Sequence, residues 1–146
     1  MIIGIGTDLV GVARIAGVHE RHGEHFLSRV YTQAERHYCL AVRQPAERLA
    51  ARWAAKEACM KALGTGWAKG VSFGDIALLP DAQGVPRLVL EGEARQVADR
   101  LGAVRWHCSV SHSDGFAIAM VILEGSGAPA AAGLGRSGDA TSMGRP

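Results

Sequence analysis

The stretch between Pro45 and Gly64 constrains the fold of this chain more than any other part of the sequence. Pro45 suits the first turn of a helix and Gly64 suits the left-handed position after a helix end, so about eighteen residues between them are predicted to be helical. Alanine and other small apolar residues dominate this stretch, which indicates a helix that lies largely inside the protein. Charged side chains on such a helix are rarely buried unless they are paired or take part in function.

Two acidic residues stand where folding alone explains them poorly. Asp8 closes the apolar opening run of residues 1–7, and Glu57 lies inside the predicted helix. If the fold brings the two carboxylates together, they form an oxygen-rich site of the kind that holds Mg²⁺ against a bound phosphate, which points to phosphoryl chemistry. Each residue also has a structural explanation, because a strand-terminal Asp often caps a turn and a helical Glu often pairs with a Lys four residues on.

Helical spacing places a positive charge beside Glu57. Trp53, Glu57 and Lys61 follow one another at intervals of four residues, so their side chains share one face of the predicted helix. Small alanines flank this face, so another part of the molecule can approach it closely. The spacing fits a binding site and a solvated Glu57–Lys61 ion pair equally well.

The composition argues against several classes of protein. The chain of 146 residues is expected to form one domain with a single core. Its formal charge is +2 and its aromatic content is 5%, too low for a stacking platform on single-stranded nucleic acid, so we expect no nucleic-acid partner. The apolar N-terminus lacks a basic leader and is interrupted by Asp8, so we expect neither a membrane span nor a targeting segment. We infer a soluble, cytoplasmic protein.

The cysteines indicate neither a disulfide framework nor a zinc site. Cys39, Cys59 and Cys108 are odd in number and show no Cys-x-x-Cys spacing. We therefore expect small core residues in a reducing cytosol.

Periodicity predicts an α+β fold. In the first half we expect a strand over residues 2–7, a helix over about 10–22, and a helix from Thr32 to about Gln44 that opens with a capping box of Thr32 and Glu35. Gly4 and Gly6 in the strand would let a ligand or another backbone come close. In the second half we expect two hairpins, 75–80 with 87–90 and 104–111 with 116–123, separated by a short helix over 93–101. Glycine, alanine, serine and proline dominate residues 125–146, so we expect a tail outside the folded domain of residues 1–124.

Alternation along the last hairpin predicts a cleft. His107, Ser109 and Ser111 face one side of the strand, whereas Trp106, Cys108 and Val110 face the other. The next strand, residues 116–121, is apolar on both sides. We interpret the polar face as the wall of a cleft with His112 at its rim.

Three separated motifs occur in the order and spacing of a known family. They are Gly4-Ile5-Gly6-Thr7-Asp8, Arg52-Trp53-Ala54-Ala55-Lys56-Glu57-Ala58 with Lys61 and Gly64-Thr65-Gly66 after it, and Ser109-Val110-Ser111-His112-Ser113. Over about residues 1 to 124 the chain resembles the holo-acyl-carrier-protein synthases, which are the small-type 4′-phosphopantetheinyl transferases. The resemblance is specific because the motifs match together, with Gly84-Val85-Pro86-Arg87-Leu88 between the second and the third.

The resemblance implies a role for each matching residue. Asp8 and Glu57 would be the two Mg²⁺ carboxylates, and with Lys61 they would form the catalytic set. The residues that would bind coenzyme A are the phosphate-binding cations Arg52 and Lys61, the backbone at Gly64, Gly66 and Pro86, and the coenzyme-A-contacting His112. Glu57, acting through a metal-bound water, is our candidate for the general base.

The resemblance also implies an activity and an assembly. A serine hydroxyl of apo-acyl carrier protein would attack the β-phosphate of coenzyme A and release 3′,5′-ADP, in fatty acid biosynthesis. The implied fold is a mostly antiparallel sheet packed with a long helix, in a homotrimer whose active sites lie between subunits. Arg14 matches a position that contacts the carrier, and Arg21 lies two turns along the same side of the first helix, so we expect the acidic carrier to dock there.

Two alternatives stay open from the sequence. One is a module that binds coenzyme A or a nucleotide without transfer, although the presence of both carboxylates argues against it. The other is a transferase that serves polyketide or peptide-synthase carrier domains, which the residue types at the site do not exclude.

Overall fold

The structure is a computed structural model, and it describes residues 1–66 and 70–127. The helices are α1 (Val12–Val30), α2 (Gln33–Leu40), α3 (Ala46–Ala62) and α4 (Gly92–Arg100), with a short 3-10 helix η1 (Phe73–Asp75). The strands are β1 (Ile2–Gly11), β2 (Ile76–Pro80), β3 (Pro86–Leu90), β4 (Ala103–Ser113) and β5 (Phe116–Gly125). The predicted α+β fold and both predicted hairpins are confirmed.

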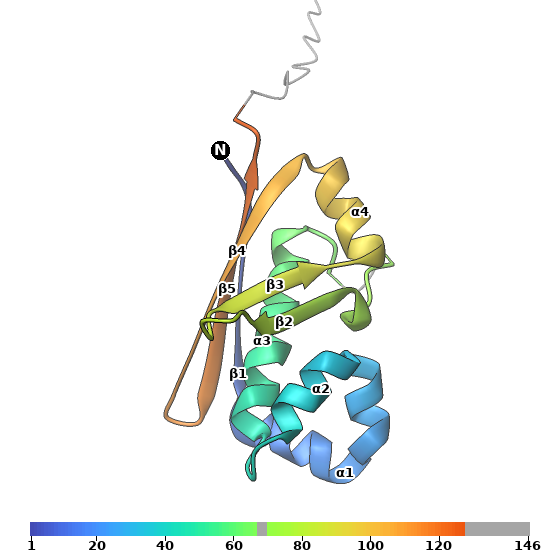
Figure 1. Cartoon of the computed structure of the whole chain (residues 1–146), viewed down its shortest axis with the longest axis vertical. Coiled ribbons are helices and arrows are strands. Elements are labelled where there is room, and N and C mark those ends of the chain that lie inside the picture. Colours follow the sequence, from blue (N-terminus) through green and yellow to red (C-terminus); the bar gives the residue numbers. More distant parts are fainter. Residues whose placement is uncertain (67–69, 128–146) are drawn as a thin grey trace, which may run out of the picture.

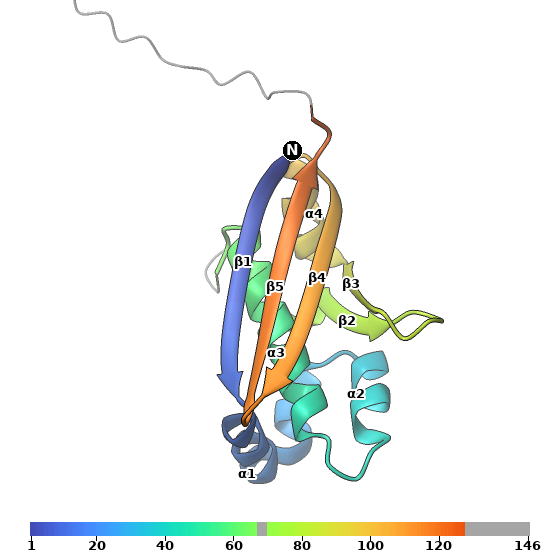
Figure 2. The ribbon, with the colours of Figure 1, turned by 90° about the vertical axis from the view of Figure 1, so that its left-hand side faces the viewer.

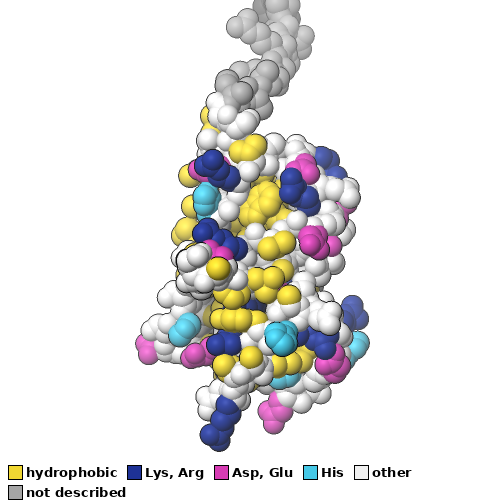
Figure 3. All heavy atoms as spheres, in the orientation of Figure 1, with side chains coloured by type: hydrophobic (Ala, Val, Ile, Leu, Met, Phe, Trp, Pro, Cys, Tyr) yellow, Lys and Arg dark blue, Asp and Glu magenta, His cyan; other side chains and the backbone are white. Residues whose placement is uncertain are grey.

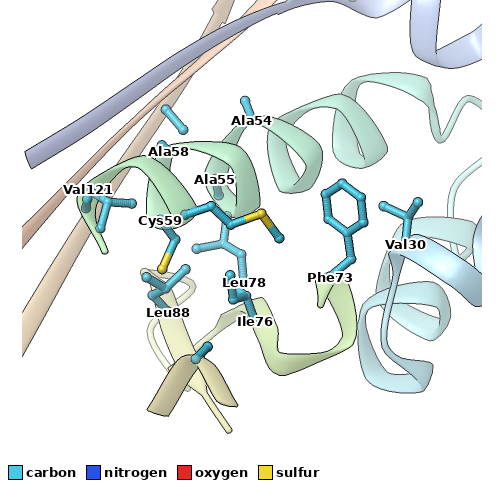
Figure 4. Close-up of a cluster of buried hydrophobic side chains, with 14 of the residues drawn as sticks. Val30, Ala54, Ala55, Ala58, Cys59, Phe73, Ile76, Leu78, Leu88 and Val121 are labelled. Atoms are coloured by element: carbon cyan, nitrogen blue, oxygen red, sulfur yellow. The ribbon is translucent and has the colours of Figure 1, made fainter. Parts of the chain in front are cut away.

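The strands form two antiparallel sheets on either side of α3 (Figures 1 and 4). One sheet has three strands in the order β1-β5-β4, and the other is the β2–β3 hairpin. Most of the α3 side chains are buried, and they form the centre of the hydrophobic core. Figure 4 shows Ala55 and Cys59 among side chains of the hairpin, such as Leu78. The expectation of a long internal helix is therefore confirmed.

The two glycines of β1 allow that strand to press against α3. A Cβ at Gly6 would lie 2.0 Å from the carbonyl oxygen of Ala58, and one at Gly4 would lie 2.4 Å from that of Ala62. The close neighbour is therefore the backbone of α3. The strand also continues to Gly11, so the expectation that Asp8 ends it is wrong. Asp8 lies inside β1 on the same face as the glycines, because side chains alternate along a strand.

We predict that Gly6→Ala destabilises the protein by about 1–3 kcal/mol, because the new methyl group would force two backbone segments apart. Gly17→Ala in α1 is the matched control, since its Cβ would approach only the end of the flexible Arg21 side chain and alanine favours a helix. Denaturant unfolding of both variants measures the difference. An unfolding free energy of Gly6→Ala equal to that of the unchanged chain would contradict the close packing of β1 on α3.

The helix boundaries follow the expected signals with two differences. The capping box of Thr32 and Glu35 is present, and Gly64 has the expected left-handed backbone with φ of 67°. The second helix ends at Leu40, earlier than expected. The first helix continues past residue 22, because Gly23, with φ of 48° and ψ of −127°, joins two helical segments at a kink.

A buried ion pair fastens α3 to its surroundings. The Nζ of Lys56 lies 2.7 Å from Oε2 of Glu35, and both side chains are fully buried. Lys56 also donates hydrogen bonds to the carbonyl oxygens of Phe73, at 2.8 Å, and of Ile76, while Oε1 of Glu35 accepts one from the backbone N–H of Leu78 at 3.0 Å. Burial lowers the pKa of Lys56, and the carboxylate of Glu35 opposes that shift. Apart from the cap, this role of Glu35 was not predicted.

The three-stranded sheet has a free apolar face, which Figure 2 shows without a covering helix. Exposed apolar side chains on it include Ile5 and Leu9 of β1 and Ile118 and Met120 of β5. His107, Ser109 and Ser111 of β4 lie opposite β5 residues of this same face. The interpretation of the polar face as a cleft wall is therefore wrong, and it arose because alternation identifies two faces without saying which one is covered.

The C-terminal part of the prediction is only partly covered by the structure. Strand β5 ends at Gly125, and residues 128–146 of the expected tail lie outside the described residues. Within the described ranges, the structure contains no helix that is both long and apolar enough to span a membrane.

Candidate active site

The close packing of β1 on α3 joins Asp8 to Lys61. The ammonium group of Lys61 donates a hydrogen bond to Oδ1 of Asp8 at 2.9 Å and another to the carbonyl oxygen of Thr7 at 2.8 Å. The side chain of Lys61 is 51% exposed, and that of Asp8 is 16% exposed. An ammonium group has three donors, so one N–H of Lys61 remains available to another acceptor beside these two bonds.

Glu57 lies one turn before Lys61 on the same face of α3, as predicted, and its side chain is partly buried. The carboxylate of Asp8 on β1 therefore contacts Lys61, and the acid on α3 lies one helical turn before this lysine. Within residues 1–66 and 70–127, no three His, Cys, Asp or Glu side chains are grouped to hold a metal ion. The pair fits Mg²⁺ nonetheless, because that ion is usually held by one or two carboxylates, several waters and the phosphates of a substrate.

The loop that follows α3 places the backbone of Gly64 and Gly66 close to Lys61 in the sequence. Gly64 donates its backbone N–H to the carbonyl oxygen of Lys61 at 3.0 Å. Gly64 and Gly66 both have left-handed φ values, of 67° and 50°, which favour glycine. A Cβ at either position would meet no atom of the described residues within 4 Å, so those residues leave space beside the backbone next to Lys61.

A second set of predicted residues lines a cleft of about 310 Å³ between α3, the β2–β3 hairpin and the end of β4. Arg52, Pro86 and His112 lie in its wall together with Tyr38, Glu47, Arg48, Ala51, Leu78, Pro80, Gly84 and Val110. The turn between β2 and β3 supplies Gly84, whose φ of 80° is left-handed. In the face that Figure 3 shows, apolar and basic side chains adjoin one another around the middle of the molecule. Because the cleft has a volume of this size and a mixed lining, it suits a small organic ligand.

The cations of this cleft are held by an aromatic ring. Arg52 is 6% exposed, and its guanidinium carbon lies 4.4 Å from the centre of the Tyr38 ring. Nδ1 of His112 lies 3.9 Å from a carboxylate oxygen of Glu47 at the rim. The prediction that His112 lies at a cleft is confirmed, although the cleft adjoins the face of β4 that carries Val110.

The candidate residues thus fall into two groups within one chain. Asp8, Glu57 and Lys61 lie where α3 meets β1, and none of them lines the cleft that holds Arg52 and His112. Tyr38 and Arg48 were missed by the sequence analysis. The signal for Arg48 was its position four residues before Arg52 on the same helix, whereas nothing in the sequence pointed to Tyr38.

The cysteines carry no chemistry at this site. Cys39 and Cys59 are fully buried and Cys108 is partly buried, and all three are free. Burial raises the pKa of Cys39 and of Cys108 to about 11 and that of Cys59 to about 12, so the thiols stay protonated near neutral pH. The expectation of small core residues is confirmed for Cys39 and Cys59.

Comparison with known proteins decides the family. The sequence model of the 4′-phosphopantetheinyl transferase superfamily matches residues 4–121. The chain belongs to this superfamily. The match includes Asp8, Glu57, Lys61 and His112, so the members of both groups lie within the part of the chain that is common to the family.

The relatives of this transferase chain are holo-[acyl-carrier-protein] synthases. The one from Gloeobacter violaceus is 51% identical over 122 residues, which cover 83% of this chain and 92% of that protein. The crystal structure of the synthase from Neisseria meningitidis has a TM-score of 0.78 and 35% identity, covering 85% of this chain and 99% of that one. The structure of the Helicobacter pylori synthase in complex with coenzyme A has a TM-score of 0.72 and 34% identity, with coverage of 82% and 99%. The expected transferase fold is confirmed.

Proposed function

We propose that this chain transfers the 4′-phosphopantetheine group of coenzyme A to a serine of apo-acyl carrier protein, releasing 3′,5′-ADP, and that it does so for fatty acid biosynthesis in the cytoplasm. The observation that carries the proposal is the contact of Lys61 with Asp8 next to Glu57. This arrangement gives one half-exposed ammonium donor and two partly buried carboxylates, which suit the transfer of a charged phosphoryl group. Relatives that bear the name of this activity support it.

In this proposal each residue of the first group has one task. Asp8 and Glu57 would hold Mg²⁺, which neutralises charge on the pyrophosphate oxygens when bound. The remaining N–H of Lys61 donates to a phosphate oxygen as negative charge develops there. The serine Oγ forms a bond to the β-phosphorus, the bond from that phosphorus to the oxygen of 3′,5′-ADP breaks, and Glu57 is our candidate to accept the serine proton.

The second group would hold the adenosine end of coenzyme A. Arg52 and His112 supply positive or hydrogen-bonding groups, and Pro86 supplies apolar surface at the turn between β2 and β3. The backbone at Gly64 and Gly66 adjoins Lys61, so it would line the path toward the phosphates.

We further propose a homotrimer with an active site at each boundary between subunits. Two observations support it: the free face of the sheet exposes a run of apolar side chains, and the two groups of site residues lie apart within one chain. Packing that face against a neighbour would bury the apolar run. Sedimentation equilibrium should give the mass of three chains. A monomer at micromolar concentration would contradict this assembly.

The proposed docking surface for the acidic carrier is the exposed side of α1 around Arg14 and Arg21. We predict that Arg14→Glu raises the KM for the carrier much more than the KM for coenzyme A, because it replaces attraction by repulsion at the encounter. Raising the salt concentration should weaken carrier binding in the same way, since exposed charges are screened beyond about 8–10 Å at physiological ionic strength.

Arg100→Glu is the matched control for the docking surface. Arg100 ends α4, at the opposite end of the molecule from α1 (Figure 1), and it is also an exposed arginine. Steady-state kinetics should show no change in either KM for this variant. Unchanged carrier kinetics and salt dependence in Arg14→Glu would place the docking surface elsewhere.

Release of 3′,5′-ADP tests the proposed activity. Chromatography of a reaction with coenzyme A, Mg²⁺ and apo-acyl carrier protein should show this product, and omission of the carrier should abolish it. Binding of coenzyme A without product would support a binding module instead. Product with carrier domains of polyketide or peptide synthases but none with the fatty acid carrier would assign the transfer to those pathways.

A further inference from the structure

Two histidines of α1 line an apolar pocket beside the proposed docking surface. The pocket has a volume of about 590 Å³ and lies between α1, α3 and the segment that leads into η1. Its wall is mostly apolar, and the rings of Phe26, Trp53 and Phe73 follow one another in it, with centroids 6.1 Å and 5.1 Å apart. His22 and His25 belong to the same lining, and both are exposed to solvent. Their imidazoles therefore lie at the rim of the pocket.

Among the described residues, the charged and titratable groups that line this pocket are all basic. Arg29 lines it one helical turn after His25. The residues that α3 and the segment around η1 add to the described lining carry no titratable group: Trp53, Met60, Val71, Ser72 and Phe73. The neighbouring titratable residues of α1, which are His19, Glu20 and Glu24, do not line the pocket, and Glu24 pairs with Arg36 of α2. The pocket thus has an apolar centre and a basic rim.

The pocket continues the proposed docking surface along α1. Val18 lines the pocket, and Arg14 and Arg21 lie four residues before and three residues after it. These spacings place the three residues on one side of the helix, ahead of the kink at Gly23. The partner that suits an apolar centre inside a basic rim is an acidic protein with apolar side chains on its docking face. A carrier bound to the two arginines would therefore extend to the histidines.

Histidine makes such a contact depend on pH. Its charge ordinarily changes between about pH 5 and pH 8, whereas arginine stays charged and carboxylates stay ionised over most of that range. A carboxylate beside an imidazole favours the protonated form, so binding of an acidic carrier would take up protons. By linkage, the affinity for the carrier then rises as the pH falls through this range.

We propose that His22 and His25 are proton-dependent contacts for the acidic carrier, so that the carrier binds more tightly when these two imidazoles are charged. This inference rests on the proposed function for the identity of the partner. It adds a titratable contact to the permanent charges of Arg14 and Arg21, and it gives a role to two histidines that lie outside the motifs of the family resemblance.

Binding of the apo-carrier at two pH values tests this contact. Calorimetry at constant ionic strength, without coenzyme A and Mg²⁺, should give a Kd for the unchanged enzyme that is about tenfold lower near pH 6 than near pH 8. Buffers of different ionisation enthalpy should show net proton uptake on binding. In the double variant His22→Gln with His25→Gln, the two Kd values should agree within about twofold. His37→Gln is the matched control, because His37 is an exposed histidine of α2 that does not line the pocket, and it should keep the full pH dependence.

A permanent charge at position 25 provides a second test. His25→Arg stays charged at both pH values, so it should bind the carrier more tightly than the unchanged enzyme near pH 8 and depend less on pH. A purely structural role of His25 would not produce this gain. Equal affinity at the two pH values in the unchanged enzyme, or full pH dependence in the double variant, would overturn the contact. If transfer fails while proton-linked binding persists and depends on the histidines, the proposed activity is wrong and the contact stands.

Discussion

Asp8→Asn and Glu57→Gln are each expected to lower kcat/KM for transfer by about two to three orders of magnitude, the loss typical of removing one electrostatic stabiliser of a transition state. Each change keeps the shape of the side chain and removes a charge that would hold Mg²⁺. In Asp8→Asn the amide oxygen of the new side chain would still accept the hydrogen bond that Lys61 now donates to the carboxylate. We therefore expect the thermal midpoint to change little while the apparent Mg²⁺ requirement rises.

Asp99→Asn is the matched control for these two variants. Asp99 is an exposed carboxylate of α4 that pairs with Arg95 at 2.9 Å, and such pairs contribute only about 0–1 kcal/mol. Its kinetics and Mg²⁺ dependence should equal those of the unchanged enzyme. Full activity of Asp8→Asn or Glu57→Gln at ordinary Mg²⁺ would remove the corresponding residue from the metal site.

Lys56→Met is expected to destabilise the protein by about 3–5 kcal/mol, because it leaves the buried carboxylate of Glu35 without its counter-charge. The pair lies fully inside the protein and connects α2, α3 and the start of β2. Replacing both partners, in Glu35→Gln with Lys56→Met, should cost less than the sum of the two single changes, since neither variant side chain carries a net charge.

Denaturant unfolding measures the three variants, with Arg95→Met as the exposed control, for which about 0–1 kcal/mol is expected. Because Glu57 follows Lys56 directly on α3, we also expect Lys56→Met to lower transfer activity at temperatures where it stays folded. A cost below about 1 kcal/mol for Lys56→Met would show that the pair is not needed to hold α3 in place.

The sequence predicted the elements whose signals are local. Pro45 and Gly64 marked the ends of α3, and the capping box of Thr32 and Glu35 marked the start of α2, because these residues act on backbone within a few positions. The continuation of α1 was missed because a glycine with a left-handed φ at position 23 joins two helical segments, and glycine usually marks a helix end.

Contacts between residues far apart in the chain could not be predicted from local sequence signals. The pairing of Lys56 with Glu35 joins two helices, and the stacking of Arg52 on Tyr38 joins two more positions far apart in the sequence. The sequence shows that Lys56, Glu35 and Arg52 are charged, but which residue each of them contacts depends on how the helices pack. The carboxylate at position 8 was identified with a metal site on chemical grounds, and the structure adds its contact with Lys61.

The mass of the carrier protein after reaction tests the central claim most directly. Full-length enzyme, coenzyme A, Mg²⁺ and apo-acyl carrier protein are incubated together, and the carrier is measured by intact mass and by peptide mapping. We predict that the carrier gains the mass of one phosphopantetheine group on a serine, and that a carrier in which this serine is replaced by alanine gains none. An unchanged carrier mass, from folded enzyme under conditions in which a known holo-[acyl-carrier-protein] synthase modifies the same carrier, would contradict the proposed function.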